Sequence, residues 1–245
     1  MVDRPASGAV NMAKDEALAA SVGAGAEGAL RIYSFAPPCV SYGRSQEEPG
    51  TLELAAFEAD GIEFVRRPTG GLSLLHMDDF TYCLVLPTSA GIDREECFAL
   101  AAGGLTGALA LLDVPSAVAT HEPAGRRSRW CFESAFGVDI ESRGRKVCGS
   151  AQRVYRDSIL QHGTLILSGG HGAMLDSLGQ EGAENVLLPL DEAAGHPVTW
   201  NEVRHALEES FSKGIGLELE PAWMDAHEDK YVRDLLDETR AAKGL

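Results

Sequence analysis

Hydrophobic positions recur along the chain in two patterns, a helical one and a strand-like one. Apolar side chains three and four residues apart predict helices, because such positions share one helix face. Short runs rich in Val, Ile, Leu, Tyr and Phe predict strands. The helical segments are 11–21, 51–60, 93–112, 199–213 and 221–242. The strand-like segments are 29–34, 39–42, 62–66, 72–76, 81–86, 137–141, 146–155 and 159–167.

The order of these segments predicts an α+β fold. Several strands follow one another with no helix between them, which favours antiparallel pairing. Gly70-Gly71 and Arg143-Gly144 lie between strand pairs, where hairpin turns are expected. We therefore expect one domain over residues 1–245, a mixed, mostly antiparallel sheet flanked by helices. The apolar stripe of the terminal helix, about residues 221–242, predicts that it packs on this body, with no separate accessory domain.

Composition and charge exclude several classes of protein. The 245 residues are 44% hydrophobic and 24% charged, which is ordinary for a globular chain. The formal net charge of −16 argues against a generic nucleic-acid binder and against a polybasic membrane-surface protein. The longest uncharged run, residues 97–112, is shorter than the roughly 20 residues that a membrane span needs, so it predicts a buried helix.

The cysteines and the N-terminus indicate a cytoplasmic protein. The five cysteines form no C-x-x-C pair, so neither a disulfide framework nor a zinc ribbon is predicted. The first 16 residues contain no apolar core of a secretory signal. The seven histidines are scattered along the chain, and no metal site is predicted.

Two segments place cations beside glycines. In 66–71 (RRPTGG) two arginines run into a glycine pair, which suits close approach to a carboxylate or phosphate but also suits a plain turn with solvated arginines. In 144–153 (GRKVCGSAQR) a lysine precedes small residues, so its ammonium could lie beside a bound acyl carbonyl. An exposed hairpin with a solvated lysine is the alternative for that segment.

A third segment contains a candidate nucleophile, Cys131. Arg126, Arg127 and Arg129 precede it, and nearby cations lower the pKa of a thiol. A buried, inert cysteine between aromatic residues is the alternative. Residues 121–160 carry eight basic and five acidic side chains in an otherwise acidic chain, which suits an anionic ligand or a small acidic partner protein.

Five segments, in this order, resemble the lipoate–protein ligase A and octanoyltransferase family. They are 11–19 (NMAKDEALA), 31–46 (RIYSFAPPCVSYGRSQ), 66–76 (RRPTGGLSLLH), 131–153 (CFESAFGVDIESRGRKVCGSAQR) and 160–167 (LQHGTLIL). The resemblance implies a catalytic domain like that of biotin and lipoate protein ligases and class II synthetases. It also implies attachment of a lipoyl or octanoyl chain to a lysine of a lipoyl domain.

Carried over residue by residue, the resemblance implies a set of site residues. Lys146 would contact the acyl carbonyl or an adenylate, and four residues would line the acyl site: Arg67, Gly70, Gly71 and His76. The head group would be held and backed by Gly149, Ser150, Ala151, Arg153, His162, Gly163 and Thr164. The family usually has an aspartate directly after the histidine, whereas this chain has Met77, with acids at Asp78 and Asp79.

Three functions are compatible with this resemblance. An octanoyltransferase would move the acyl group from acyl carrier protein through a Cys131 thioester to an apo lipoyl domain, with Cys131 and Lys146 as catalytic residues and no cofactor. A ligase would use ATP and Mg²⁺ to form lipoyl-AMP, and it could need a separate accessory chain. A non-catalytic binder of lipoate or lipoyl domains is the third.

Two sequence features favour the transferase. Cys131 begins a CFE segment that resembles the CFD segment of ligase-like octanoyltransferases, and the glycine motif continues with Leu72 rather than a third glycine. The acceptors implied are lipoyl domains of glycine-cleavage H protein or of 2-oxoacid dehydrogenase subunits. No nucleic acid and no membrane is expected as a partner.

Overall fold

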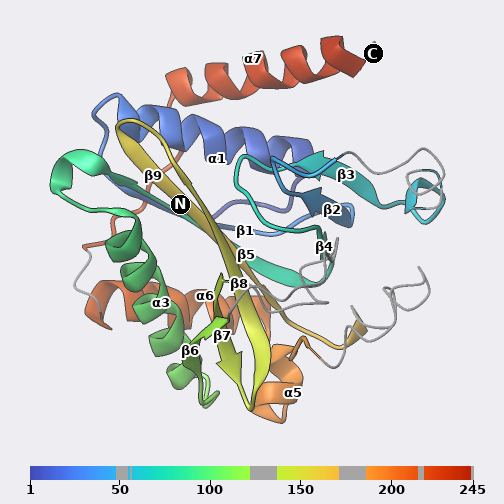
Figure 1. The fold of residues 1–245 in the computed structure, drawn as a ribbon, viewed down its shortest axis with the longest axis vertical. Helices are drawn as coiled ribbons and strands as arrows, with labels where there is room; N and C mark the ends of the chain where they lie inside the picture. Colours follow the sequence, from blue (N-terminus) through green and yellow to red (C-terminus); the bar gives the residue numbers. More distant parts are fainter. Residues whose placement is uncertain (48–54, 56, 122–136, 171–185, 215–217, 244–245) are drawn as a thin grey trace.

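A six-stranded sheet forms the centre of the molecule (Figure 1). The computed structural model describes residues 1–47, 55, 57–121, 137–170, 186–214 and 218–243. The strand order is β1-β5-β9-β8-β7-β6, and every neighbouring pair is antiparallel. The strands are β1 (Ala29–Tyr33), β5 (Asp79–Pro87), β6 (Ala117–His121), β7 (Gly137–Ser142), β8 (Arg145–Val154) and β9 (Ser158–Ile166).

A second, three-stranded sheet lies beside the first and has the order β3-β2-β4. Its strands are β2 (Cys39–Tyr42), β3 (Glu63–Arg66) and β4 (Leu74–His76). β2 pairs in parallel with β3 and antiparallel with β4. The hairpin expected at Gly70-Gly71 is therefore wrong, because β2 lies between the two strands that this segment joins. The turn at Arg143-Gly144 is confirmed as the β7–β8 hairpin.

Helices cover both faces of the large sheet. α1 (Gly8–Gly23) packs on one face, and α7 (Ala226–Lys243) lies outside α1, as Figure 1 shows at the top of the molecule. α3 (Arg94–Leu111) and α6 (Trp200–Glu209) pack on the other face. Both begin with a capping box, at Asp93 and Thr199. Shorter helical pieces are η1 (Thr88–Ala90), α5 (Leu190–Ala194) and η3 (Ser210–Gly214).

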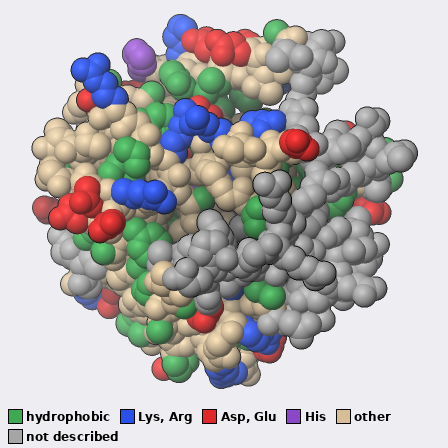
Figure 2. All heavy atoms as spheres, viewed as in Figure 1, with side chains coloured by type: hydrophobic (Ala, Val, Ile, Leu, Met, Phe, Trp, Pro, Cys, Tyr) green, Lys and Arg blue, Asp and Glu red, His purple; other side chains and the backbone are tan. Residues whose placement is uncertain are grey.

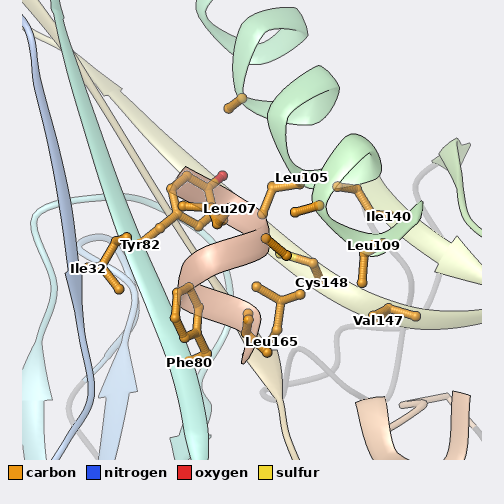
Figure 3. Packing of buried hydrophobic residues seen from close by; sticks show 14 of the residues in the cluster. Ile32, Phe80, Tyr82, Leu105, Leu109, Ile140, Val147, Cys148, Leu165 and Leu207 are labelled. Carbon is orange, nitrogen blue, oxygen red and sulfur yellow. The ribbon is translucent and has the colours of Figure 1, made fainter. Parts of the chain in front are cut away.

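The largest hydrophobic core lies between the sheet and the α3–α6 side (Figure 3). Leu105 and Leu109 of α3 and Leu207 of α6 belong to this core together with Phe80 and Tyr82 of β5. All five are at most 1% exposed. The uncharged run 97–112 is thus the buried helix that the sequence predicts, packed on a sheet.

Most predicted elements are confirmed, with shifted ends. Every predicted strand segment overlaps an observed strand, and four of the five predicted helices are present. Half of the predicted helix 51–60 lies outside the described residues; in the other half, Ala55 and residues 57–59 are helical. The prediction missed β6 and α5. β6 (AVATH) contains one large apolar residue, and α5 has five residues, fewer than a helical period needs to be recognised.

Candidate active site

A cavity of about 530 Å³ opens between the two sheets, α1 and the N-terminus of α3. Apolar side chains form much of its wall, among them Met12, Phe35, Leu74, Phe98 and Ile166. Such a mostly apolar cavity with a few polar groups is typical of a small-molecule site. Eleven of the thirteen predicted site residues line it: Arg67, Gly70, Gly71, His76, Lys146, Gly149, Ser150, Ala151, His162, Gly163 and Thr164.

Two predicted site residues are not placed in the cavity. Arg153 is absent from its lining; its guanidinium stacks 4.4 Å from the ring centre of Tyr155, and its Nη1 lies 3.5 Å from the carbonyl oxygen of Pro68. The structure therefore places the guanidinium of Arg153 between Tyr155 and Pro68 of the RRPTGG segment. Cys131 lies outside the described residues.

Lys146 forms a buried ion pair with Asp139 inside the cavity wall. Nζ of Lys146 lies 2.8 Å from Oδ1 of Asp139, and the two side chains are 7% and 2% exposed. Asp139 is opposite Gly149 in the β7–β8 ladder, and an irregularity between Ile140 and Glu141 shifts the register next to it. This bulge brings Lys146, three residues before Gly149, to the same face as Asp139, because bulges re-aim side chains.

Gly149 leaves the space that the Lys146 side chain occupies. A Cβ atom at Gly149 would lie 2.6 Å from Cε and 2.8 Å from Nζ of Lys146, closer than atoms can approach without moving. The main chain of Lys146 is also held, because its N–H donates to the carbonyl of Val186 and its carbonyl accepts from Leu188, both at 2.8 Å. The main-chain hydrogen bonds hold the backbone of Lys146, and its ammonium lies against Asp139 in the space over Gly149.

The guanidinium of Arg67 binds the main chain of the glycine segment. Its Nη2 donates to the carbonyls of Gly70 and Leu72, both at 2.7 Å, and its Nη1 donates to the carbonyl of Ser41 at 3.1 Å. Gly71 has a φ of 92°, in the region that favours glycine. Arg67 therefore holds the main chain of this segment while also lining the cavity, as expected of it.

His76 is held on three sides, which answers the question raised by Met77. Nδ1 of His76 lies 2.7 Å from Oδ2 of Asp79, three residues along the chain. Nε2 lies 2.8 Å from Oγ of Ser41, and the ring stacks on Phe35 at 3.9 Å. Position 77 is a methionine in this chain, so the carboxylate beside His76 comes from Asp79 instead.

His162 joins α1 to the RRPTGG segment. Its Nδ1 lies 3.0 Å from Oδ2 of Asp15, and its Nε2 lies 2.7 Å from Oγ1 of Thr69. Burial lowers the pKa of His162, against the opposing effect of Asp15. Burial acts to raise the pKa of Asp15, but the hydrogen bond from His162 and the charge of Arg31 outweigh it, so this pKa lies below its ordinary value. Both shifts favour a neutral His162 beside a charged Asp15.

The four described cysteines are all buried. Burial raises the pKa of Cys97 to about 11 and that of Cys148 to about 12, and it raises the pKa of Cys83 well above its ordinary value. A thiol with such a pKa supplies almost no thiolate near neutral pH. Cys148, the second thiol in the lysine hairpin, is therefore a packing residue of the main core.

The face of the molecule drawn in Figure 2 is mixed in charge. Lys and Arg side chains lie on its upper half with Asp and Glu side chains among them. Within the described ranges, no three His, Cys, Asp or Glu side chains gather as metal ligands do. No described helix is long and apolar enough to cross a membrane.

Three site residues escaped the sequence analysis as functional candidates: Asp15, Asp79 and Asp139. Asp15 lies in segment 11–19 and Asp139 in segment 131–153, two of the segments that carry the family resemblance. Their place in these segments was the one sign in the sequence that they could belong to the site. Their partners are 147, 3 and 7 residues away along the chain. Only the fold brings the first of these pairs together.

Comparison with known proteins finds one family. The lipoyl protein ligase A/B catalytic domain matches residues 7–212. The octanoyltransferase LipM of Symbiobacterium thermophilum is 34% identical over 250 residues, covering 94% of this chain and 90% of that protein. The octanoyltransferase LipM of Kyrpidia tusciae is 32% identical, covering 94% of this chain and 91% of that protein.

Solved structures show the same fold. A lipoate-protein ligase A bound with ATP has a TM-score of 0.80 at 21% identity, covering 97% of this chain and 93% of that chain. A bi-partite lipoate protein ligase from Thermoplasma acidophilum, analysed with its E2 lipoyl domain, has a TM-score of 0.75 at 20% identity. Its coverage is 97% of this chain and 90% of that chain. The expected fold class is confirmed.

Proposed function

Because the chain belongs to the family of lipoyl protein ligase A/B catalytic domains, we propose that it is an octanoyltransferase of protein lipoylation. The donor is an octanoyl thioester of acyl carrier protein, and the acceptor is a lysine of an apo lipoyl domain. The observation that carries the proposal is the buried Lys146–Asp139 pair in the wall of a largely apolar cavity. An acyl chain suits the apolar wall, and a fixed ammonium suits the developing negative charge of its reacting carbonyl.

The reaction proceeds as two acyl transfers. The thiolate of Cys131 attacks the carbonyl carbon of the donor, a carbon–sulfur bond to Cys131 forms, and the carrier thiol leaves with a proton. The amine of the acceptor lysine then attacks this thioester, the amide bond forms, the Cys131 sulfur leaves, and the amine gives up a proton. Lys146 stabilises the negative charge on the carbonyl oxygen in both steps, and dividing one difficult transfer into two lowers the barrier.

The ATP-dependent ligase is the second candidate, since one structure of this fold is a ligase bound with ATP. In that reaction Lys146 contacts the adenylate, and ATP and Mg²⁺ are required. The transferase is preferred because the relatives above 30% identity named here are octanoyltransferases.

Intact-mass spectrometry of an apo lipoyl domain distinguishes the two candidates. One incubation contains octanoyl-acyl carrier protein without ATP; the other contains free octanoate, ATP and Mg²⁺. We expect the mass increase of one octanoyl group in the first incubation alone. Modification in the second alone establishes the ligase, and modification in neither favours a binding protein or a missing accessory chain.

Gly149→Ala tests whether the position of the Lys146 ammonium matters. The new methyl group overlaps Cε and Nζ of Lys146, so the ammonium is displaced from the cavity wall. We expect the rate of octanoyl transfer to fall roughly 10–100-fold, because small misplacements of reacting groups have effects of that size. Gly169→Ala is the matched control, since a Cβ there meets nothing within 4 Å. Equal rates for the two variants would contradict the placement of Lys146 in the reaction.

A further inference from the structure

A buried network centred on Asp15 lies beneath the cavity, and the proposed mechanism does not use it. Asp15 of α1 and Arg31 of β1 are both fully buried. Nη1 of Arg31 lies 2.7 Å from Oδ1 of Asp15, and Nη2 of Arg31 donates to Oδ1 of Asn11 at 2.7 Å. Nε of Arg31 lies 2.7 Å from Asp3, which also pairs with Lys14. Two carboxylates thus face two cations, and the network is balanced in charge.

The second oxygen of Asp15 is directed at the cavity. Oδ2 accepts hydrogen bonds from the hydroxyl of Tyr33 at 2.9 Å and from Nδ1 of His162 at 3.0 Å. Tyr33 and His162 come from two different strands, and both line the cavity. One carboxylate therefore orients two side chains of the cavity wall.

The charge balance decides which ring nitrogen of His162 carries the proton. Arg31 already neutralises Asp15, so His162 need not be charged, and burial lowers its pKa. A carboxylate only accepts, so the proton of the neutral ring lies on Nδ1. Nε2 is then an acceptor. The fully buried hydroxyl of Thr69 lies 2.7 Å from it and donates the hydrogen bond.

Thr69 carries this orientation into the RRPTGG segment. It directly precedes Gly70 and Gly71, which line the cavity. Its carbonyl also accepts from the N–H of Arg44 at 2.8 Å, so the residue is held on both sides. We propose that Asp15 is a positioning residue: through the Nδ1–H tautomer of His162 it fixes Thr69, and with it the glycine wall of the acyl cavity.

Histidine NMR tests the tautomer independently of any activity. In ¹⁵N-histidine-labelled protein at pH 7, the His162 signals, assigned by their loss in His162→Phe, are expected to show a proton on Nδ1 and none on Nε2. Thr69→Val is expected to shift the Nε2 signal, because the donating hydroxyl is gone. A proton on Nε2, on both nitrogens, or an unchanged Nε2 signal in Thr69→Val overturns the proposal.

A double-mutant cycle tests the effect on the reaction; this readout rests on the proposed function. We expect Thr69→Val to lower kcat about tenfold or more, because it keeps the shape of the side chain but frees the wall to move. Thr69→Ser, which restores the hydroxyl, is expected to stay within about twofold of wild type. We call the chain of hydrogen bonds Asp15–His162–Thr69 the relay. The double variant of His162→Phe and Thr69→Val is expected to have a kcat within about twofold of the less active single variant, because both substitutions break the same relay.

The controls separate this proposal from the choice of reaction. Thr106→Val removes a hydroxyl that bonds the carbonyl of Ala102 on α3, remote from the relay, and it is expected to leave kcat unchanged. The relay is overturned if Thr69→Val has the kcat of the wild type. It is also overturned if the two substitutions lower kcat independently, so that their effects multiply in the double variant. Wild-type protein that works only with ATP overturns the transferase, and the cycle is then measured in the ATP reaction. Protein inert with both donors leaves the decision to the NMR result.

Discussion

Replacing Cys131 with alanine is expected to abolish octanoyl transfer from a thioester donor. A covalent route needs a thiolate, and the four described cysteines are buried, with raised pKa values for Cys83, Cys97 and Cys148. Of the five thiols, Cys131 is the remaining candidate. We expect the rate to fall by at least about 10³-fold, as it does when a nucleophile is removed. The measurement is the mass increase of an apo lipoyl domain with octanoyl-acyl carrier protein as donor.

Cys148→Ala is the matched control for that substitution. Cys148 is equally a cysteine of the 131–153 segment, but it is 1% exposed and packs in the main core. We expect its loss to lower stability modestly and to leave transfer intact. A second test traps the intermediate: wild-type protein with the donor alone gains one octanoyl group, and Cys131→Ala gains none. Full transfer by Cys131→Ala would contradict a covalent intermediate on Cys131 and would favour the ATP-dependent reaction at Lys146.

Lys146→Met is expected to have the second largest effect, on both activity and stability. The substitution removes the ammonium that stabilises the reacting carbonyl, so transfer should slow at least about 100-fold. It also leaves the buried carboxylate of Asp139 without the cation 2.8 Å away. Removing one member of a buried ion pair typically costs about 3–5 kcal/mol, so the free energy of unfolding should fall by that order. Urea unfolding and the mass-spectrometric assay measure the two effects separately.

The double variant Lys146→Met with Asp139→Asn separates folding from chemistry. Because the buried negative charge is gone as well, we expect the free energy of unfolding to recover most of its loss. Activity should stay at the level of the single variant, since the ammonium is still missing. Recovery of transfer together with stability would show that Lys146 acts only by holding the fold, and would contradict its role at the carbonyl.

The sequence alone determined most of the local structure. Short runs of apolar residues located a strand in each of the eight predicted segments, because strands such as β5 and β9 are buried along nearly their whole length. The capping pairs beginning at Asp93 and Thr199 are local, and the Arg143-Gly144 turn joins strands that are neighbours in the chain. Eleven of the residues carried over by resemblance do line one cavity. The strands, caps and hairpin turn depend on residues close together in the sequence. The cavity residues were found because each belongs to a short family motif.

Tertiary structure alone decided the pairings. Periodicity does not report which strand is the neighbour of another, so it could not show that β2 separates β3 from β4 and removes the expected hairpin at Gly70-Gly71. It could not show that Arg67 binds main-chain carbonyls or that Arg153 contacts Pro68. Nor could it show that Asp79 is the carboxylate beside His76. The contact between Asp15 and His162 spans 147 residues. Hydrogen bonds and ion pairs form between groups that folding brings within about 3 Å, and that proximity is a property of the packed chain rather than of any segment.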